Sequence, residues 1–432
     1  MKKVGVISLG CSKNLVDSEN IIGLLEKDKY EITNKPELAD IIIINTCGFI
    51  DKSKKESIET IFEMLNYHKK VVVCGCLVQR YLEELKKELP EVDLFIPIKD
   101  YPRFNELLQT IDDELNVNEV NGVSYKYRHI STGPISAYLR IGDGCDNRCS
   151  YCAIPLIRGS FHSRPLEEII LEAKTLAKEG VKEVVVLEQD TSKYGIDLKD
   201  NTNIVTVLKE LLKIKEFDYI RLLYLYPDEI SDELIDLISK EKRLTPYFDV
   251  PIQHSEDHIL KDMNRRGDKK FLKDLFKKIK EKVPSAVLRT TVMVGFPNES
   301  EEDVDNLIKF MEEIEFDHLG AFSYSKEENT PAYYFTNQVS DEDKKKRLDK
   351  VMKAQQKISY RKAKSHIGEV MEGLIVGQDK DYYLFRSYWN APDDVDGYIY
   401  IESDIKDHKI GDKIKVKIEK AFVYDLFGKE VK

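Results

Sequence analysis

The sequence predicts an α/β protein with three parts: a small doubly wound parallel domain, a partial (βα)6 barrel of the TIM type, and an antiparallel OB-like β-barrel at the C-terminus. Three observations support this. Apolar runs alternate with amphipathic stretches up to about residue 98, a longer alternation begins at residue 137, and short alternating strands end the chain. At 432 residues the chain is also too long for one ordinary core.

The first part combines buried strand patterns with amphipathic helices. Strands are expected at residues 4–9, 41–44, 71–73 and 94–98, and helices at 17–27, 53–65 and 78–89. Ser53-Lys-Lys-Glu56 has the form of a capping box and predicts a helix start at Ser53. Residues 99–135 are expected to form a linker with one helix near 103–111.

The second part contains six strand–helix units, which predict a partial barrel rather than an eight-fold one. Its strands are expected at 137–141, 183–188, 219–223, 247–251, 287–295 and 319–324, and its helices at 165–179, 204–214, 228–239, 269–282 and 300–314. A long helix follows at 340–364, where ten Lys+Arg against four Asp+Glu give +6. The last strands are expected at 370–376, 382–388, 397–401 and 414–423.

Composition narrows the functional class. The chain has 78 Asp+Glu against 67 Lys+Arg, and this excess of acid argues against bulk attraction to nucleic acid. No apolar run approaches the roughly 18 residues that span a bilayer. All seven cysteines lie within the first 152 residues, and they show no disulfide-like framework. This usage predicts thiolate or metal chemistry in a reducing cytoplasm.

Cys145, Cys149 and Cys152 form a C-x3-C-x2-C triplet with no cysteine after it. A [4Fe–4S] cluster normally takes four cysteines, so three leave one iron open. An open coordination position is typical of a catalytic metal site. The alternative is zinc, which prefers four protein ligands in two pairs, and no second pair lies nearby.

A second triad is expected at the edge of the first sheet. Cys11, Cys47 and Cys76 each lie in a strand-to-helix turn, and these turns share the carboxyl edge of a parallel sheet. The alternative is three ordinary buried thiols. Cys74 is left over; we interpret it as a buried strand residue, although its closeness to Cys76 leaves competition for iron open.

These motifs resemble the radical S-adenosylmethionine (SAM) methylthiotransferases. The triplet carries an aromatic residue, Tyr151, before its last cysteine, as is usual among radical SAM enzymes. Three other segments resemble the cluster-binding turns of the family's amino-terminal domain: Leu9-Gly-Cys-Ser-Lys-Asn14, Asn45-Thr-Cys-Gly48 and Gly75-Cys-Leu-Val-Gln79. The resemblance implies an amino-terminal methylthiotransferase domain at 1–115, a radical SAM core at 131–362 and a TRAM domain at 363–432.

The resemblance also implies the cofactors. Two [4Fe–4S] clusters are expected, one on Cys11, Cys47 and Cys76, and one on Cys145, Cys149 and Cys152, whose open iron chelates SAM. Residues near barrel strand ends are candidates to line the SAM pocket. We name Tyr151, Glu188 and Gly295 as candidate cofactor-binding residues and Gln253, His254 and Arg289 as candidate catalytic residues. Ordinary alternatives are that Glu188 caps a loop, Arg289 is paired structurally and His254 only donates a hydrogen bond.

Several segments resemble the branch that modifies an aspartate of small-subunit ribosomal protein twelve, among them Gly142-Asp-Gly-Cys-Asp146 and Arg386-Ser-Tyr388. Residues 366–432 carry 10 Lys+Arg against 14 Asp+Glu, and a net −4 suits a basic protein better than phosphate. The loop at Trp389 departs from the branch pattern, which bears on docking. The sulfur donor and electron donor are not indicated.

Three alternatives stay open. Within the family, the alternative is a methylthiotransferase acting on tRNA isopentenyladenosine at C2. Outside it, one alternative is an electron carrier with two clusters. The other is an RNA-binding protein with structural metal, based on the basic helix and the TRAM-like barrel.

Overall fold

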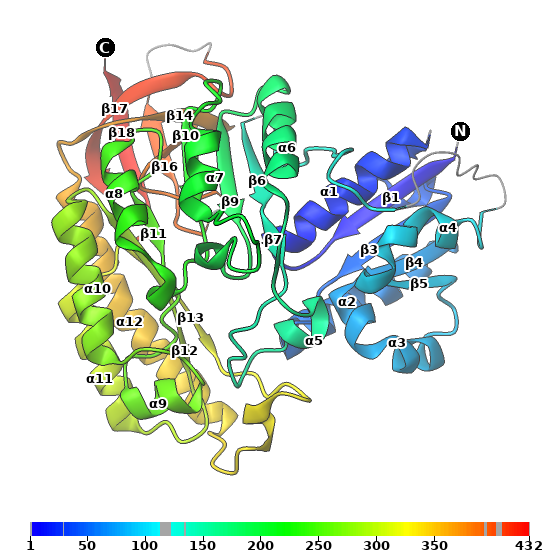
Figure 1. Ribbon diagram of the computed structural model, residues 1–432, viewed down its shortest axis with the longest axis horizontal. Coiled ribbons are helices and arrows are strands. Elements are labelled where there is room, and N and C mark those ends of the chain that lie inside the picture. Colours follow the sequence, from blue (N-terminus) through cyan, green and yellow to red (C-terminus); the bar gives the residue numbers. More distant parts are fainter. Residues whose placement is uncertain are drawn as a thin grey trace.

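The computed structural model describes residues 2–28, 30–112, 122–133, 135–392, 395–402 and 408–431. Three lobes follow one another along the chain, and the first stands to one side of the other two (Figure 1). The first lobe carries α1 to α4, the second the parallel strands with their outer helices, and the third the closed barrel at the C-terminus.

The first lobe is a five-stranded parallel sheet in the order β2-β1-β3-β4-β5. Side chains of α1 and α4 pack on one face and those of α2 and α3 on the other, so the domain is doubly wound, as predicted. The elements are β1 (Lys3–Ser8), α1 (Ser12–Lys27), β2 (Glu31–Ile32), β3 (Ile41–Thr46), α2 (Asp51–Leu65), β4 (Lys70–Gly75), α3 (Cys76–Glu88), β5 (Leu94–Pro97) and α4 (Phe104–Leu108).

Two expectations for this lobe were wrong in detail. Helix α2 begins at Asp51 after Ile50, so Ser53 lies inside the helix and forms no capping box; its hydroxyl instead lies near Cys47. Helix α1 begins five residues before the expected position, because the polar residues after Cys11 are buried against the sheet edge. A capping box does occur at Ser300, which exchanges hydrogen bonds with Asp303.

The second lobe is a partial barrel of parallel strands, as predicted. Two three-stranded sheets, β10-β9-β6 and β11-β12-β13, are joined by a parallel bridge between Ile220 and Leu244, just before β11, and by a hydrogen bond from Leu225 N to the Asp249 carbonyl. The strands are β6 (Ser136–Arg140), β9 (Glu183–Leu187), β10 (Tyr219–Leu222), β11 (Tyr247–Asp249), β12 (Val287–Val294) and β13 (His318–Ser323). The outer helices are α6 (Leu166–Lys178), α7 (Ile204–Leu211), α8 (Asp232–Lys240), α10 (Lys269–Lys282) and α11 (Glu301–Ile314).

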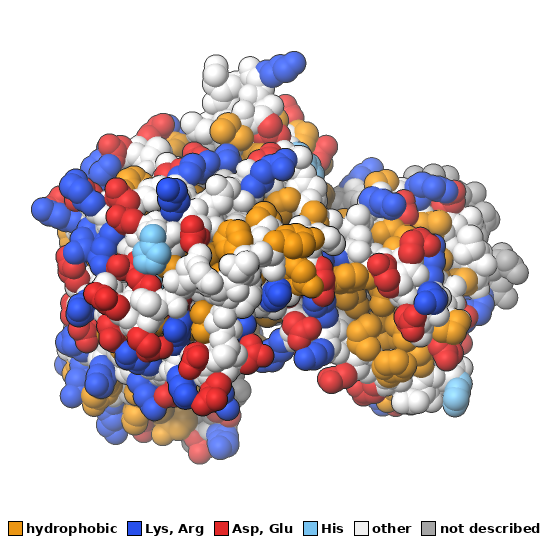
Figure 2. Space-filling view, turned by 90° about the horizontal axis from the view of Figure 1, so that it is seen from below, with side chains coloured by type: hydrophobic (Ala, Val, Ile, Leu, Met, Phe, Trp, Pro, Cys, Tyr) orange, Lys and Arg blue, Asp and Glu red, His pale blue; other side chains and the backbone are white. Residues whose placement is uncertain are grey.

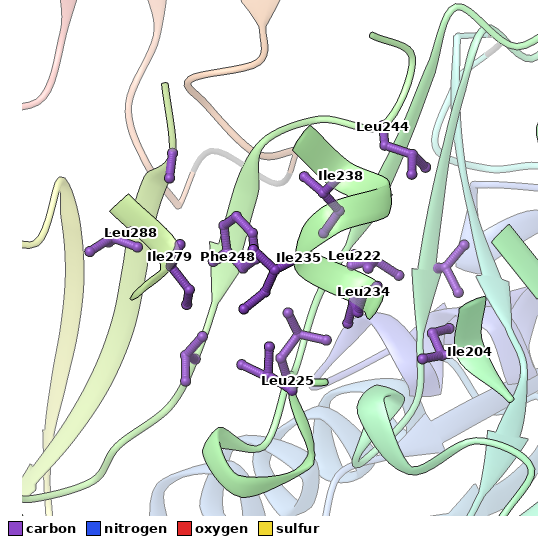
Figure 3. Close-up of a cluster of buried hydrophobic side chains, with 14 of the residues drawn as sticks. Ile204, Leu222, Leu225, Leu234, Ile235, Ile238, Leu244, Phe248, Ile279 and Leu288 are labelled. Atoms are coloured by element: carbon purple, nitrogen blue, oxygen red, sulfur yellow. The ribbon is translucent and has the colours of Figure 1, made fainter. Parts of the chain in front are cut away.

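The barrel core explains the amphipathic pattern of these helices. Ile235 and Ile238 of α8 and Ile279 of α10 face the strand residues Phe248 and Leu288 in one buried cluster (Figure 3). Each fully buried side chain of this size contributes about 1.5–3 kcal/mol. Four short elements complete the lobe: β7 (Gly142–Asp143), α5 (Ile154–Arg158), β8 (His162–Ser163) and α9 (Asp257–Asp262).

Helix α12 (Asp341–Ser365) leads into the last lobe, a closed barrel in the order β14-β15-β16-β18-β17. Its strands are β14 (Val370–Asp379), β15 (Tyr382–Ser387), β16 (Ile399–Glu402), β17 (Lys413–Ala421) and β18 (Leu426–Val431). The antiparallel expectation needs a correction, because β16 and β18 pair in parallel. Over the part of the chain described, no helix is long and apolar enough to cross a membrane.

The last barrel is docked on the second lobe by buried polar contacts. Arg221 of β10 donates to the carbonyls of Ser387 at 2.9 Å and Tyr388 at 3.2 Å. Trp389 is 2% exposed, and its ring centre lies 4.6 Å from that of His318 and 5.7 Å from that of His366. The unusual Trp389 is therefore an internal packing residue, while Asp393 and Asp394 of the same loop lie outside the described residues.

Candidate active site

The first cysteine triad lies at the carboxyl edge of the five-stranded sheet. Cys11 is the N-cap of α1, Cys47 follows β3, and Cys76 opens α3. Glycines let these turns approach closely: a Cβ on Gly10 would lie 2.7 Å from Cβ of Cys47, and one on Gly48 would lie 2.8 Å from the carbonyl oxygen of Cys76. The turns are thus packed against one another, as the strand-end argument predicts.

Two buried asparagines fix the triad's backbone. The Asn14 amide donates to the carbonyls of Leu9 at 2.6 Å and Asn45 at 3.2 Å, and the Asn45 amide donates back to the Asn14 carbonyl at 2.9 Å. Ser57 Oγ accepts from Cys47 N at 3.1 Å. Both asparagines lie in the quoted motifs, yet their clamping role depends on a long-range pairing that sequence reasoning missed.

Burial favours the protonated form of two thiols of this triad, Cys47 and Cys76. It raises the pKa of Cys76 to about 12, against a partial lowering by the Arg158 guanidinium, and it also raises the pKa of Cys47. Cys74 is fully buried in the core of the sheet, and burial raises its pKa to about 12. A bound metal reverses this balance, because a coordinating thiol is deprotonated.

The second triad lies on one loop between β7 and α5. Cys145 N donates to the Gly159 carbonyl at 3.2 Å, and Cys152 N donates to the Cys149 carbonyl at 3.0 Å. Ile154 N donates to Cys152 Sγ at 3.5 Å. Burial raises the pKa of Cys145 to about 11. These hydrogen bonds fold the loop back on itself and onto the segment after α5.

Arg265 is a neighbour of this loop that sequence reasoning missed. Its Nη1 lies 3.8 Å from Cys149 Sγ and 3.4 Å from Tyr151 Oη, and its guanidinium carbon lies 4.2 Å from the ring centre of Tyr226. The Tyr226 hydroxyl lies 3.9 Å from Cys149 Sγ. Tyr151 thus stands at the cluster loop, and its role as a cofactor-binding residue stays a prediction.

Glu188, just after β9, has both carboxylate oxygens buried without a hydrogen-bond partner among the described residues. A Cβ on Gly142 would lie 2.5 Å from its Oε1, so that glycine makes room for the carboxylate. Burial raises the pKa of Glu188 well above its usual value, and Asp143 and Asp190 raise it further. A buried acid of this kind suits a cationic ligand.

Gln253 and His254 follow β11. Gln253 has a φ of +69°, a strained conformation for a non-glycine residue, and its Oε1 is buried without a described partner. His254 accepts at Nδ1 from Glu256 N at 3.1 Å, which leaves the proton on Nε2, 3.6 Å from Glu299 Oε2. These contacts favour a structural role for His254, and both catalytic assignments stay predictions.

Arg289 lies in the structurally paired setting that was its alternative, whereas the setting of Gly295 was not indicated by the sequence. Arg289 pairs with Asp249 at 2.8 Å and with Asp396 of the last barrel at 3.4 Å, contacts that join lobes and do not involve the cysteine loop. Gly295 has a φ of +73°, and the space where its Cβ would stand is filled by the Lys344 side chain. The close approach at Gly295 is therefore to α12, so its contact with a ligand is left without structural support.

Family models match all three lobes. Residues 3–97 match Uncharacterized protein family UPF0004, residues 139–311 the Radical SAM superfamily, and residues 367–431 the TRAM domain. Among named proteins, ribosomal protein uS12 methylthiotransferase RimO of Alkaliphilus oremlandii is 46% identical and covers 98% of both chains. The RimO of Aquifex aeolicus is also 46% identical, covering 99% of this chain and 97% of the relative.

This chain belongs to the RimO methylthiotransferase family. Solved structures agree on the fold. The radical SAM methyltransferase TsrM from Kitasatospora setae matches with a TM-score of 0.56 at 14% identity, over 74% of this chain and 73% of that one. The cobalamin-dependent SAM radical enzyme OxsB matches with a TM-score of 0.52 at 13% identity, over 83% and 56%.

A radical SAM methylthiotransferase works with SAM and [4Fe–4S] clusters, and the residues at the barrel mouth fit them. No three potential ligands in the described ranges converge closely enough for a single metal ion. A cluster is wider than an ion, so its cysteines stand further apart. Orphaned buried polar atoms also gather at the strand ends, on Glu188, Gln189, Gln253, Ser255 and Tyr324, where a polar ligand would satisfy them.

Proposed function

We propose that this protein transfers a methylthio group to the β-carbon of an aspartate in ribosomal protein uS12. The observation that carries the proposal is the full-length identity of 46% to a uS12 methylthiotransferase, in a chain that itself contains two cysteine triads. Small-subunit protein twelve is thus the proposed partner, and tRNA adenosine is the alternative within the family. A ribosomal substrate also implies work in the cytoplasm and no role for a membrane.

We assign the first cluster to Cys11, Cys47 and Cys76 and the second to the Cys145, Cys149 and Cys152 loop, with SAM at the open iron of the latter. When bound, these cofactors supply the one-electron chemistry that breaks an unactivated C–H bond and the sulfur that is transferred. Tyr151 and Glu188 are proposed to border SAM. Burial raises the pKa of Glu188, and a cation bound beside it would favour the charged carboxylate.

The residues of the chain itself bring the two triads toward each other. Lys13, two residues after Cys11, lies with its Nζ 3.4 Å from the ring centre of Tyr224 at the end of β10. Ser12 Oγ lies 3.5 Å from the hydroxyl of the same tyrosine. Tyr224 has a φ of +61°, a strained backbone where a barrel strand meets the first lobe. This contact orients the two lobes with their cysteine-bearing edges facing.

The substrate would enter where the two lobes part. In the space-filling view a notch separates the first lobe from the rest, with hydrophobic side chains gathered on the first lobe beside it (Figure 2). Arg80 and Lys54 of the first lobe pair with Glu327 of the second at 2.9 Å and 3.0 Å, which fixes the spacing of the lobes. The acidic final barrel, at net −4, complements a basic ribosomal protein.

We propose three domains, at 1–115, 131–362 and 363–432, and shift the boundary between the last two. Helix α12 continues to Ser365, so a limit at 362 would cut its last turn. The TRAM domain is better begun at His366, which caps that helix and donates to the Ala363 carbonyl at 3.2 Å.

The deciding experiment is anaerobic. Reconstituted protein with SAM, sulfide and a reductant is incubated in parallel with uS12 and with bulk tRNA, and both are analysed by mass spectrometry. We expect a methylthio adduct on one aspartate peptide of uS12 and none on adenosine. An adduct on adenosine alone would retain the chemistry and overturn the substrate. The Cys11→Ala variant should form no product; full product from it would refute the role of the first triad.

A further inference from the structure

Arg158 reaches from the second cysteine loop into the first triad. It ends α5, the helix that starts two residues after Cys152. Its Nη2 lies 3.6 Å from Cys76 Sγ and 3.3 Å from Asn14 Oδ1, both in the first lobe. The side chain is 2% exposed, so these contacts are made away from water. One residue thus touches a ligand of the first triad while its backbone belongs to the second loop.

A buried network of charges holds this guanidinium in place. Arg158 pairs with Asp17 at 2.7 Å and with Asp143 at 3.3 Å. Arg140 pairs with the same two carboxylates, at 2.8 Å and 3.7 Å. Asp17 lies on α1 of the first lobe, and the other members lie on the second lobe. The charges of the two arginines and the two aspartates therefore cancel while the Cys76 thiol is uncharged.

A ligating thiolate and an added electron both place negative charge beside this network. In a dry site such a charge interacts strongly with a cation at close range. Hydrogen bonds and nearby charges are among the features that set the reduction potential of an iron–sulfur cluster. The Arg158 guanidinium is held by its contacts with Asn14, Asp17 and Asp143. It therefore lies beside Cys76 already and can stabilise negative charge there without moving.

We propose that Arg158 is a positioning residue for the first cluster, which holds Cys76 and its turn and raises the reduction potential of the cluster that Cys76 ligates. Because Arg158 is carried by α5, the helix after the second cysteine loop, it ties the geometry of one triad to the other. Asp17 is the carboxylate nearest to this guanidinium, and its negative charge lowers the reduction potential of the same cluster. The inference rests on the proposed cluster assignment of the first triad.

The test measures the first cluster alone. A full-length chain with Cys145→Ala, Cys149→Ala and Cys152→Ala is reconstituted, and the cluster midpoint potential is measured by EPR-monitored titration. In this background Arg158→Gln should make the potential more negative, Arg158→Lys should restore most of it, and Asp17→Asn should make it more positive. Arg265→Gln is the matched control, since Arg265 is a buried guanidinium beside Cys149, and it should leave the first cluster's potential unchanged.

Each outcome has a meaning. An unchanged potential in both Arg158→Gln and Asp17→Asn would overturn the inference and leave the proposed function intact. A folded triple variant that takes up no cluster would instead refute the cluster assignment itself. Iron lost from a folded Arg158→Gln chain but kept in Arg158→Lys would support the inference. If the Arg158 variants do not fold, as judged by circular dichroism, the nearly isosteric Asp17→Asn decides by the direction of its shift.

Discussion

At the residue scale, Glu188 stands out because its carboxyl group is buried and has no hydrogen-bond donor among the described residues. Burial raises its pKa above the usual 4.5, so the folded state holds a proton that the unfolded state releases. This proton contributes to the free energy of unfolding in full below the unfolded-state pKa. The contribution is lost as pH rises from there through the folded-state pKa. Glu188→Gln does not titrate and should escape this loss.

We therefore expect the metal-free Glu188→Gln variant to be more stable than the wild type at neutral pH. The difference should widen by up to about 1.4 kcal/mol per pH unit above the unfolded pKa. Thermal unfolding from about pH 5 to about pH 9 measures it. Parallel curves for the two proteins would show that Glu188 ionises normally. The same substitution should weaken SAM binding in reconstituted protein.

Cys74 and Cys76 are neighbours with different expected roles. Cys74 is fully buried in the hydrophobic core of the sheet, whereas Cys76 opens α3 at the sheet edge. Cys74→Ala should keep the iron content of the first triad and lower the free energy of unfolding by about 1 kcal/mol, for the small cavity it leaves. Cys76→Ala should lose that iron. Iron loss from Cys74→Ala instead would give Cys74 a place in the metal site.

At the scale of elements, strongly periodic segments were predictable and short ones were not. Helix α10 (Lys269–Lys282) has the bounds that its apolar spacing predicts. The expected strand at 414–423 ends at Ala421, and β18 was missed because Gly428 breaks its apolar pattern. Helix α5 was missed because five residues carry too little periodicity.

The residues of the candidate site also fall into those that the sequence predicts and those that it does not. The cysteines could be named from their spacing and from the turns that carry them. Arg158, Arg265 and Asn14 could not, since their partners lie far away in sequence and only the packing of the lobes brings them together. Arg289 lies in a barrel strand and pairs with the carboxylates of Asp249 and Asp396, which favours the structural alternative, and its catalytic role stays a prediction.

The pairing of α3 with the segment after β13 gives a prediction at this scale. Arg80 of α3 and Glu327 are 4% and 2% exposed, and Arg80 also donates to the Gly48 carbonyl beside Cys47. Arg80→Ala should lower the free energy of unfolding by about 3 kcal/mol, because it removes one partner of a buried pair. It should also open residues 325–334 to proteolysis.

Lys86→Ala on the same helix is the control for Arg80→Ala. Lys86 pairs with Glu83 in an exposed contact, worth only about 0.3–0.5 kcal/mol. Chemical unfolding of the two variants compares them directly. Equal effects would mean that the Arg80 contact does not hold the lobes together.

At the scale of the whole molecule, Asp396 is a buried carboxylate that helps to attach the last barrel to the second lobe. Asp396 accepts from Tyr247 Oη at 2.5 Å and from Ala391 N at 2.9 Å, and it pairs with Arg289 at 3.4 Å. Tyr247 and Arg289 belong to the partial barrel, and Asp396 to the TRAM-like lobe. The second and third lobes are therefore expected to unfold together.

Asp396→Asn should make the last barrel unfold more easily than the second lobe. Burial alone would raise the Asp396 pKa, but His318 and Arg289 outweigh it, and the pKa is lowered below 3.8. A carboxylate with a lowered pKa stabilises the fold above its unfolded pKa, and that contribution is lost as pH falls through the folded-state value. The variant should thus lose about 3 kcal/mol at neutral pH, with the deficit shrinking in strong acid. Hydrogen exchange should then show β14–β18 opening before β11 and β12, and joint opening at wild-type rates would refute the role given to Asp396.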